Sequence, residues 1–182
     1  MTALAPHQPT KTWRLAISAG LLSTACMVGN ASELILPGFR PSEPQRLKIW
    51  GFEIYDARLW TKAAFSVPQF TSQSFGLEIT YLRKVEGKDI AKSSIDEMKR
   101  IGQISPEQQK AWFKAMSDTF PSVGNGDKLL GVYKPNEGAE FWINQKPLGV
   151  ISDPQFAKLF FGIWLHEATS APAIRRAWMN TP

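Results

Sequence analysis

Apolar and polar residues alternate most clearly between positions 75 and 85. An apolar side chain recurs at every second position, which predicts a β-strand with one face on a core; these residues are Phe75, Leu77, Ile79, Tyr81 and Val85. Arg83 falls on the same side of the predicted strand. Tyr81 and Arg83 are therefore either a satisfied buried phenol and a cation that reaches water, or part of the lining of a cleft.

Two further β-prone runs meet at Gly51. A glycine readily takes the positive φ of a tight turn, so a hairpin is predicted with Gly51 and Phe52 as its turn. In that register Arg46 and Lys48 lie on the same face as Tyr55. A guanidinium and a phenol that share one face can hold a carboxylate, although an exposed arginine at a strand edge is the alternative explanation.

The apolar period becomes helical after Gly87. A helix is predicted over 90–101, and the capping box that begins at Ser105 predicts a second helix. The buried stripe expected for this second helix is Trp112, Phe113, Met116 and Phe120. The segment from Phe156 to Leu165 is apolar on almost every side, which predicts a central helix covered on both sides. A short last helix is expected over 174–179.

The remaining pattern predicts more strands. Residues 33–36 are expected to form a first strand, and residues 128–133 and 139–143 a second hairpin. Residues 61–74 lack clear periodicity, so a loop or a weak edge segment is expected there. This order predicts an α+β fold, with a mostly antiparallel sheet and helices packed on one face.

The N-terminus has the features of a secretory signal. Lys11 and Arg14 precede an apolar run over 15–28, and small residues follow up to Ala31. We therefore expect residues 1–31 to be a signal peptide, residues 32–182 to be one domain, and the protein to be periplasmic or secreted. Cys26 lies inside this segment, and its surroundings differ from a lipoprotein processing site.

Composition excludes several classes of function. Without residues 1–31 the chain has no cysteine and one histidine, His166, which rules out thiol nucleophiles and Cys/His zinc sites. The formal charge falls from +5 to +3 with Lys11 and Arg14 removed, and both signs are interleaved, so no nucleic-acid partner is expected. No metal and no cofactor are expected. No later apolar run is long enough for a transmembrane span.

Four motifs resemble bacterial chalcone isomerase-like proteins. They are Trp-Gly-x-x-Ile-Tyr-Asp-Ala-x-Leu-Trp at 50–60, Leu-Glu-Ile-x-Tyr at 77–81, Gly-Lys-x-Ile-Ala at 87–91, and Ile-Trp-Leu with Thr-Ser-x-Pro at 163–172. The resemblance covers essentially all of residues 32–182. It implies the open-faced sandwich of that family, which agrees with the predicted α+β layout.

The same resemblance suggests which residues contact a ligand. The enzymes of this fold use an arginine, threonine, tyrosine, asparagine and a late hydroxyl, which correspond here to Arg46, Tyr55, Ile90, Glu97 and Ile163. Four of the five differ, so catalysis of the chalcone isomerase type is not expected. A fatty-acid-binding branch of the fold keeps the arginine and has tyrosine in place of the threonine, and Arg46 and Tyr55 match that pair.

We therefore expect a non-catalytic binding protein for a small amphipathic carboxylate such as a fatty acid. The predicted ligand-binding residues are Arg46, Tyr55, Tyr81, Ile90 and Ile163. Two alternatives stay open: an intramolecular lyase or isomerase of chalcone isomerase type, and a protein-interaction module without a ligand. A binder requires an apolar cavity, an isomerase a polar cleft, and an interaction module a filled core.

Overall fold

The structure is a computed structural model, and it describes residues 1–2 and 35–179. Residues 3–31 of the predicted signal peptide, which include Cys26, therefore lie outside the described residues. Within the described part no helix is long and apolar enough to cross a membrane.

Within the described residues, seven strands form one antiparallel sheet. They are β1 (Arg40–Pro41), β2 (Gln45–Ile49), β3 (Phe52–Thr61), β4 (Phe75–Tyr81), β5 (Lys128–Lys134), β6 (Gly138–Ile143) and β7 (Lys146–Ile151). The order across the sheet is β1-β3-β4-β5-β6-β7, and β2 also pairs with β3. β4 lies between β3 and β5 and forms the strand that the alternation over residues 75–85 predicted.

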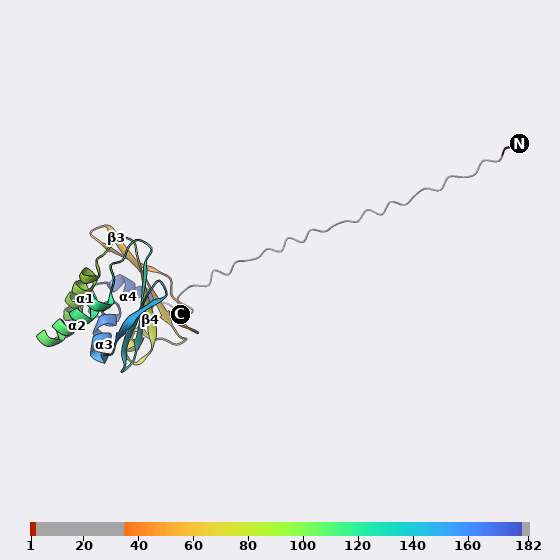
Figure 1. Cartoon of the computed structure of the whole chain (residues 1–182). Coiled ribbons are helices and arrows are strands. Elements are labelled where there is room, and N and C mark those ends of the chain that lie inside the picture. Colours follow the sequence, from red (N-terminus) through yellow and green to blue (C-terminus); the bar gives the residue numbers. More distant parts are fainter. Residues whose placement is uncertain (3–34, 180–182) are drawn as a thin grey trace.

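In the part of the chain that the structure describes, four α-helices lie on one side of this sheet (Figure 1). They are α1 (Gly87–Ile101), α2 (Pro106–Thr119), α3 (Pro154–Leu165) and α4 (Pro172–Met179), and a 3₁₀ helix, η2 (Val67–Ser72), precedes β4. The predicted capping box forms at the start of α2, where the Ser105 side chain accepts a hydrogen bond from the Gln108 backbone N–H. Asp153 caps α3 through two backbone N–H groups. The predicted α+β fold is confirmed.

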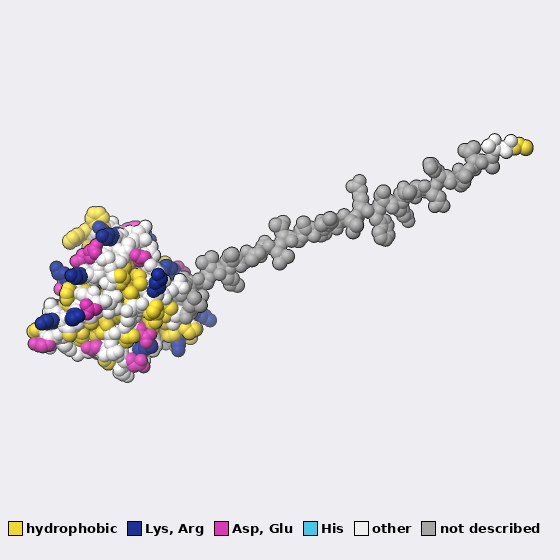
Figure 2. Space-filling view, viewed as in Figure 1, with side chains coloured by type: hydrophobic (Ala, Val, Ile, Leu, Met, Phe, Trp, Pro, Cys, Tyr) yellow, Lys and Arg dark blue, Asp and Glu magenta, His cyan; other side chains and the backbone are white. Residues whose placement is uncertain are grey.

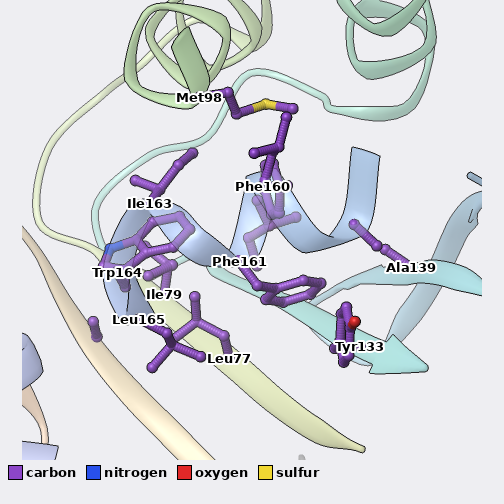
Figure 3. Close-up of a cluster of buried hydrophobic side chains, with 14 of the residues drawn as sticks. Leu77, Ile79, Met98, Tyr133, Ala139, Phe160, Phe161, Ile163, Trp164 and Leu165 are labelled. Atoms are coloured by element: carbon purple, nitrogen blue, oxygen red, sulfur yellow. The ribbon is translucent and has the colours of Figure 1, made fainter. Parts of the chain in front are cut away.

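The main core lies between the sheet and α3. Nine of the twelve residues of α3 are buried, which confirms the prediction of a central helix covered on both sides. Figure 3 shows how the helix is held: Phe160 points toward Met98 of α1, and Phe161 points toward Tyr133 of β5. The rings of Phe161 and Tyr133 meet edge to face, with centroids 5.5 Å apart. α3 therefore joins the sheet to α1.

A second, smaller apolar cluster covers part of the opposite face of the sheet. It consists of Leu36, Trp60, Leu130 and Val132. A Cβ atom at Gly76 would lie 2.3 Å from the end of the Leu36 side chain, so the glycine makes room for that leucine. The prediction of a strand over 33–36 is wrong for the two residues that the structure describes, because Ile35 and Leu36 lie in a turn.

Three other sequence-based predictions need correction. β7 was not predicted, because Pro147 and Gly149 make its sequence unlike a strand. The segment that was expected to be a loop or weak edge contains η2. Phe113 was placed in the buried stripe of α2, but it is exposed, and Trp112 and Met116 form that stripe.

Candidate functional site

The β2–β3 hairpin turns one residue earlier than predicted. Trp50 and Gly51 occupy the turn, with φ of 48° and 83°, and Ile49 pairs with Phe52. An irregularity in register follows between Leu47 and Lys48, after which the strands pair in a different frame. Since successive side chains on a strand point to opposite faces, this shift exchanges the faces of the β2 residues.

Arg46 consequently lies opposite Asp56, and Leu47 lies opposite Tyr55. The guanidinium of Arg46 donates to the Asp56 carboxylate at 2.7 and 2.8 Å and to the Glu53 carboxylate at 2.9 Å. Hydrogen bonds from Arg46 lower the pKa of both carboxyl groups. The prediction that Arg46 shares one face with Tyr55 is wrong, and Arg46 forms an exposed ion-pair network.

A cavity of about 560 Å³ lies between the sheet, α1 and α3. Its inner walls are apolar side chains and rings from β4, β5 and α3, including Leu77, Ile79, Leu129, Phe161 and Trp164. Several of the lining residues are exposed: Lys48, Ile49 and Trp50 of the hairpin, Asp89 and Ser93 of α1, and Ser170. These exposed residues define the mouth of the cavity.

Two phenols line the cavity side by side. Tyr55 and Tyr81 are directly opposed in the β3–β4 register, and their rings meet edge to face with centroids 6.2 Å apart. The Tyr55 hydroxyl accepts a hydrogen bond from Nε1 of Trp164 at 2.8 Å. The Tyr81 hydroxyl has no hydrogen-bond partner among the described residues. Each phenol can therefore donate its own proton to an oxygen atom within the cavity.

Both phenols stay protonated near neutral pH. Burial raises the pKa of Tyr55, and the nearby negative charge of Glu97 raises it further. Burial likewise raises the pKa of Tyr81. The cavity wall thus offers neutral hydroxyl donors.

The ionisable lining residues give the cavity little attraction for an anion. Lys48 is the one cation among the lining residues that the structure describes, and it pairs with Glu53 at 3.1 Å. Asp89 and Glu97 add two carboxylates, and Glu97 has a 3.5 Å contact with the exposed Arg100. A carboxylate deep in the cavity would face Glu97 without a free cation beside it.

Of the five predicted ligand-binding residues, four line the cavity: Tyr55, Tyr81, Ile90 and Ile163. Arg46 does not. The alternative in which Arg83 lines the cleft is also wrong, because Arg83 is exposed and its guanidinium lies 5.7 Å from the ring centre of Phe52.

Sequence reasoning missed the Leu47 and Trp164 contributions to the site. Leu47 was missed because of the shifted register. The hydrogen bond between Trp164 and Tyr55 joins residues that are far apart in sequence and lie in different motifs, so no local pattern indicates the contact. His166 ends α3 and is absent from the cavity lining. Within the described residues no cluster of His, Cys, Asp or Glu could hold a metal ion.

An antiparallel sheet, a single helical layer and a cavity between them define an open-faced α+β sandwich with an internal pocket. The chain belongs to the chalcone isomerase-like family, whose sequence profile matches residues 32–177. The predicted resemblance is confirmed. No curated protein sequence matches the chain significantly.

A solved structure supports the fold. The chain is similar to a fatty-acid-binding protein of Arabidopsis thaliana, with a TM-score of 0.60 and 7% sequence identity. The similarity covers 79% of this chain and 87% of the plant chain. At this identity the likeness establishes the shared fold.

The ion-pair network of Arg46 leads to a first prediction. Arg46→Ala should change the affinity for a fatty acid by less than about twofold, because the guanidinium lies outside the cavity. If Arg46 held the carboxylate, as the sequence suggested, the loss would be about tenfold to a hundredfold. Titration of lauric acid by calorimetry distinguishes these two expectations. A large loss of affinity for lauric acid, with the affinity for dodecanol unaffected, would place Arg46 in the binding site.

Proposed function

We propose that this domain binds a small amphipathic lipid, such as a fatty acid, without transforming it. The observation that carries the proposal is the apolar cavity of about 560 Å³ with two neutral phenols in its wall. Pockets of about 300–1,000 Å³, mostly apolar with a few placed polar groups, are typical of small-molecule sites. The plant protein with this fold is a fatty-acid-binding protein, which supports the same assignment.

The phenols are the best placed groups to hold the polar end of such a ligand. The Tyr81 hydroxyl has no partner in the described residues, and the Tyr55 hydroxyl keeps a proton to donate. An alcohol, an ester or a protonated acid each present an oxygen acceptor. An ionised acid presents one too, but it would meet the charge of Glu97.

The isomerase alternative has less support. Ile90 and Ile163 line the cavity at the positions where the resemblance places hydrogen-bonding side chains of the enzymes. Aliphatic groups cannot orient a reacting phenol or an ordered water molecule. An interaction module with a filled core is less consistent with the cavity.

We further propose that the protein acts in the periplasm or outside the cell. The support is the pattern of residues 1–31, with two cations, an apolar run and small residues before position 32.

One experiment addresses ligand and export together. Native mass spectrometry of the protein from the periplasmic extract of its natural host should show a chain that begins at Ser32 and carries an acyl-containing adduct. The adduct should disappear after extraction with organic solvent and return on addition of lauric acid or dodecanol. A chain that neither retains nor takes up either lipid would refute the binding proposal.

The charge of the cavity adds a pH dependence to this prediction. Lauric acid should bind more tightly at about pH 5 than at about pH 8, because the protonated fraction of lauric acid grows as the pH falls and the neutral acid is not repelled by Glu97. The affinity for dodecanol should change much less with pH. Tighter binding of lauric acid at the higher pH would contradict the proposed protonated form.

Tyr81→Phe should weaken the binding of both lauric acid and dodecanol by about threefold to tenfold through the loss of one hydrogen bond.

A further inference from the structure

The tip of the β2–β3 hairpin is strongly apolar and exposed. Trp50 is 94% exposed, Phe52 64% and Ile49 45%. Figure 2 shows hydrophobic side chains projecting from the molecule at the end where Figure 1 places this hairpin. Elsewhere in residues 35–179 the large exposed apolar side chains are Phe113, Val150 and Met179, which come from three separate elements.

Trp50 also has an unfavourable backbone conformation. Its φ of 48° lies in the left-handed region, where asparagine and glycine are the usual residues of a two-residue turn. The β6–β7 hairpin of this chain has Asn144 at φ 47° at the first position of its turn, followed by Gln145 at φ 71°. A tryptophan at such a position adds backbone strain to the exposure of an indole. Local structure gives no reason for Trp50, which points to a contact outside the domain.

The surroundings of the tip indicate the chemistry of that contact. Ile49 and Trp50 also line the mouth of the cavity. Basic side chains flank the apolar group: Lys48, which pairs with Glu53, and Arg83, which lies over the ring of Phe52. Tryptophan and phenylalanine beside lysine and arginine are typical of segments that enter the interface of a lipid bilayer, where the rings lie at headgroup level and the cations reach phosphates.

We propose that the β2–β3 hairpin tip docks the domain on a phospholipid membrane, with the mouth of the cavity at the bilayer surface. A ligand can then pass between the bilayer and the cavity, a consequence that rests on the proposed function. The docking itself needs no ligand. Because acidic Glu53 and Glu86 offset Lys48 and Lys84, apolar insertion dominates, and docking should persist at high salt.

The test is co-sedimentation of the chain from Ser32 with phosphatidylcholine vesicles, with and without phosphatidylglycerol. This chain includes the whole described fold, since every strand, helix and core residue lies within residues 35–179. The parent should bind both kinds of vesicle, with at most a small gain from the anionic lipid. Trp50→Asn combined with Phe52→Ser should reduce partitioning about tenfold or more, equivalent to about 1.4 kcal/mol.

Trp50→Asn alone provides a check on folding, because it introduces the Asn-Gly pair that this turn favours. Its melting temperature should equal or exceed that of the parent while vesicle binding falls. The matched control is Phe113→Ser combined with Val150→Ser, which removes exposed apolar side chains from α2 and β7 and should leave binding unchanged.

Three results would overturn the docking proposal. The first is a parent that stays in solution with both kinds of vesicle. The second is an equal loss in the tip variant and the control. The third is a parent dimer, seen by analytical ultracentrifugation, that becomes monomeric in the tip variant, because a second copy would then be the partner. Loss of acyl binding in solution with vesicle docking intact would instead count against the proposed function alone.

Discussion

Gly138→Ala is expected to destabilise the domain by more than about 3 kcal/mol, a large share of the stability of an ordinary domain. Gly138 begins β6 with φ 138°, a conformation that is essentially restricted to glycine. A Cβ atom there would lie 2.2 Å from the carbonyl oxygen of Ile151 and 3.0 Å from the backbone nitrogen of Asp153. Backbone atoms cannot move aside as a side chain does, so the end of β7 and the cap of α3 would have to shift.

Gly126→Ala is the matched control. Gly126 also has a positive φ, of 88°, but a Cβ atom would meet nothing within 4 Å. This substitution should cost only about 1–2 kcal/mol, the strain of a left-handed non-glycine residue. Urea unfolding of both variants measures the difference. Equal losses in the free energy of unfolding would mean that the backbone at the β6–β7 end of the sheet shifts more easily than its packing indicates.

Ile90→Trp is expected to abolish lipid binding while the domain stays folded. Ile90 lines the cavity from α1 and is only half buried, so a larger ring can enter the cavity without displacing the core. A ligand that loses about 120 Å² of apolar contact loses about 3 kcal/mol, which corresponds to more than about a hundredfold in affinity. Displacement of the neutral fluorescent probe N-phenylnaphthylamine by dodecanol provides the measurement.

Lys92→Trp controls for the added indole, since Lys92 is exposed on the same helix and absent from the cavity lining. It should bind dodecanol as the parent does. Ile90→Ala should retain binding, because it enlarges the cavity. Unchanged affinity in a folded Ile90→Trp variant would show that the lipid binds elsewhere.

Much of this fold could be predicted because local patterns and tertiary packing agree. β4 alternates strictly, α2 begins with a complete capping box, and α3 is apolar all round because it lies between the sheet and α1. β7 could not be predicted, since Pro147 and Gly149 fit only an edge strand whose pairing is fixed by the preceding turn.

The site was predicted only in part, from the strand pattern and from the family resemblance. Tyr81 follows from the alternation of β4, whereas Ile90 and Ile163 came from the family resemblance. Arg46 was misplaced because the register irregularity between Leu47 and Lys48 was not anticipated. The turn was also assigned one residue too late, but that error alone would have left Arg46 opposite Tyr55. Glycine is usual at the first position of one type of two-residue turn, and the prediction placed Gly51 there. In the structure Trp50 takes the first position and Gly51 the second. A pairing shift of one residue reverses every side chain of a strand, so an unanticipated irregularity in register becomes a large error at a binding site.

Leu36 packs on the face of the sheet opposite the cavity, where Gly76 leaves space for its side chain. The start of the described fold is thereby tied to one side of the molecule, and the mouth of the cavity opens on the other. A domain attached to a sensor chip through its N-terminal end would therefore present its open side outward. Immobilisation through surface lysines would instead engage Lys48 in part of the molecules and obstruct the mouth.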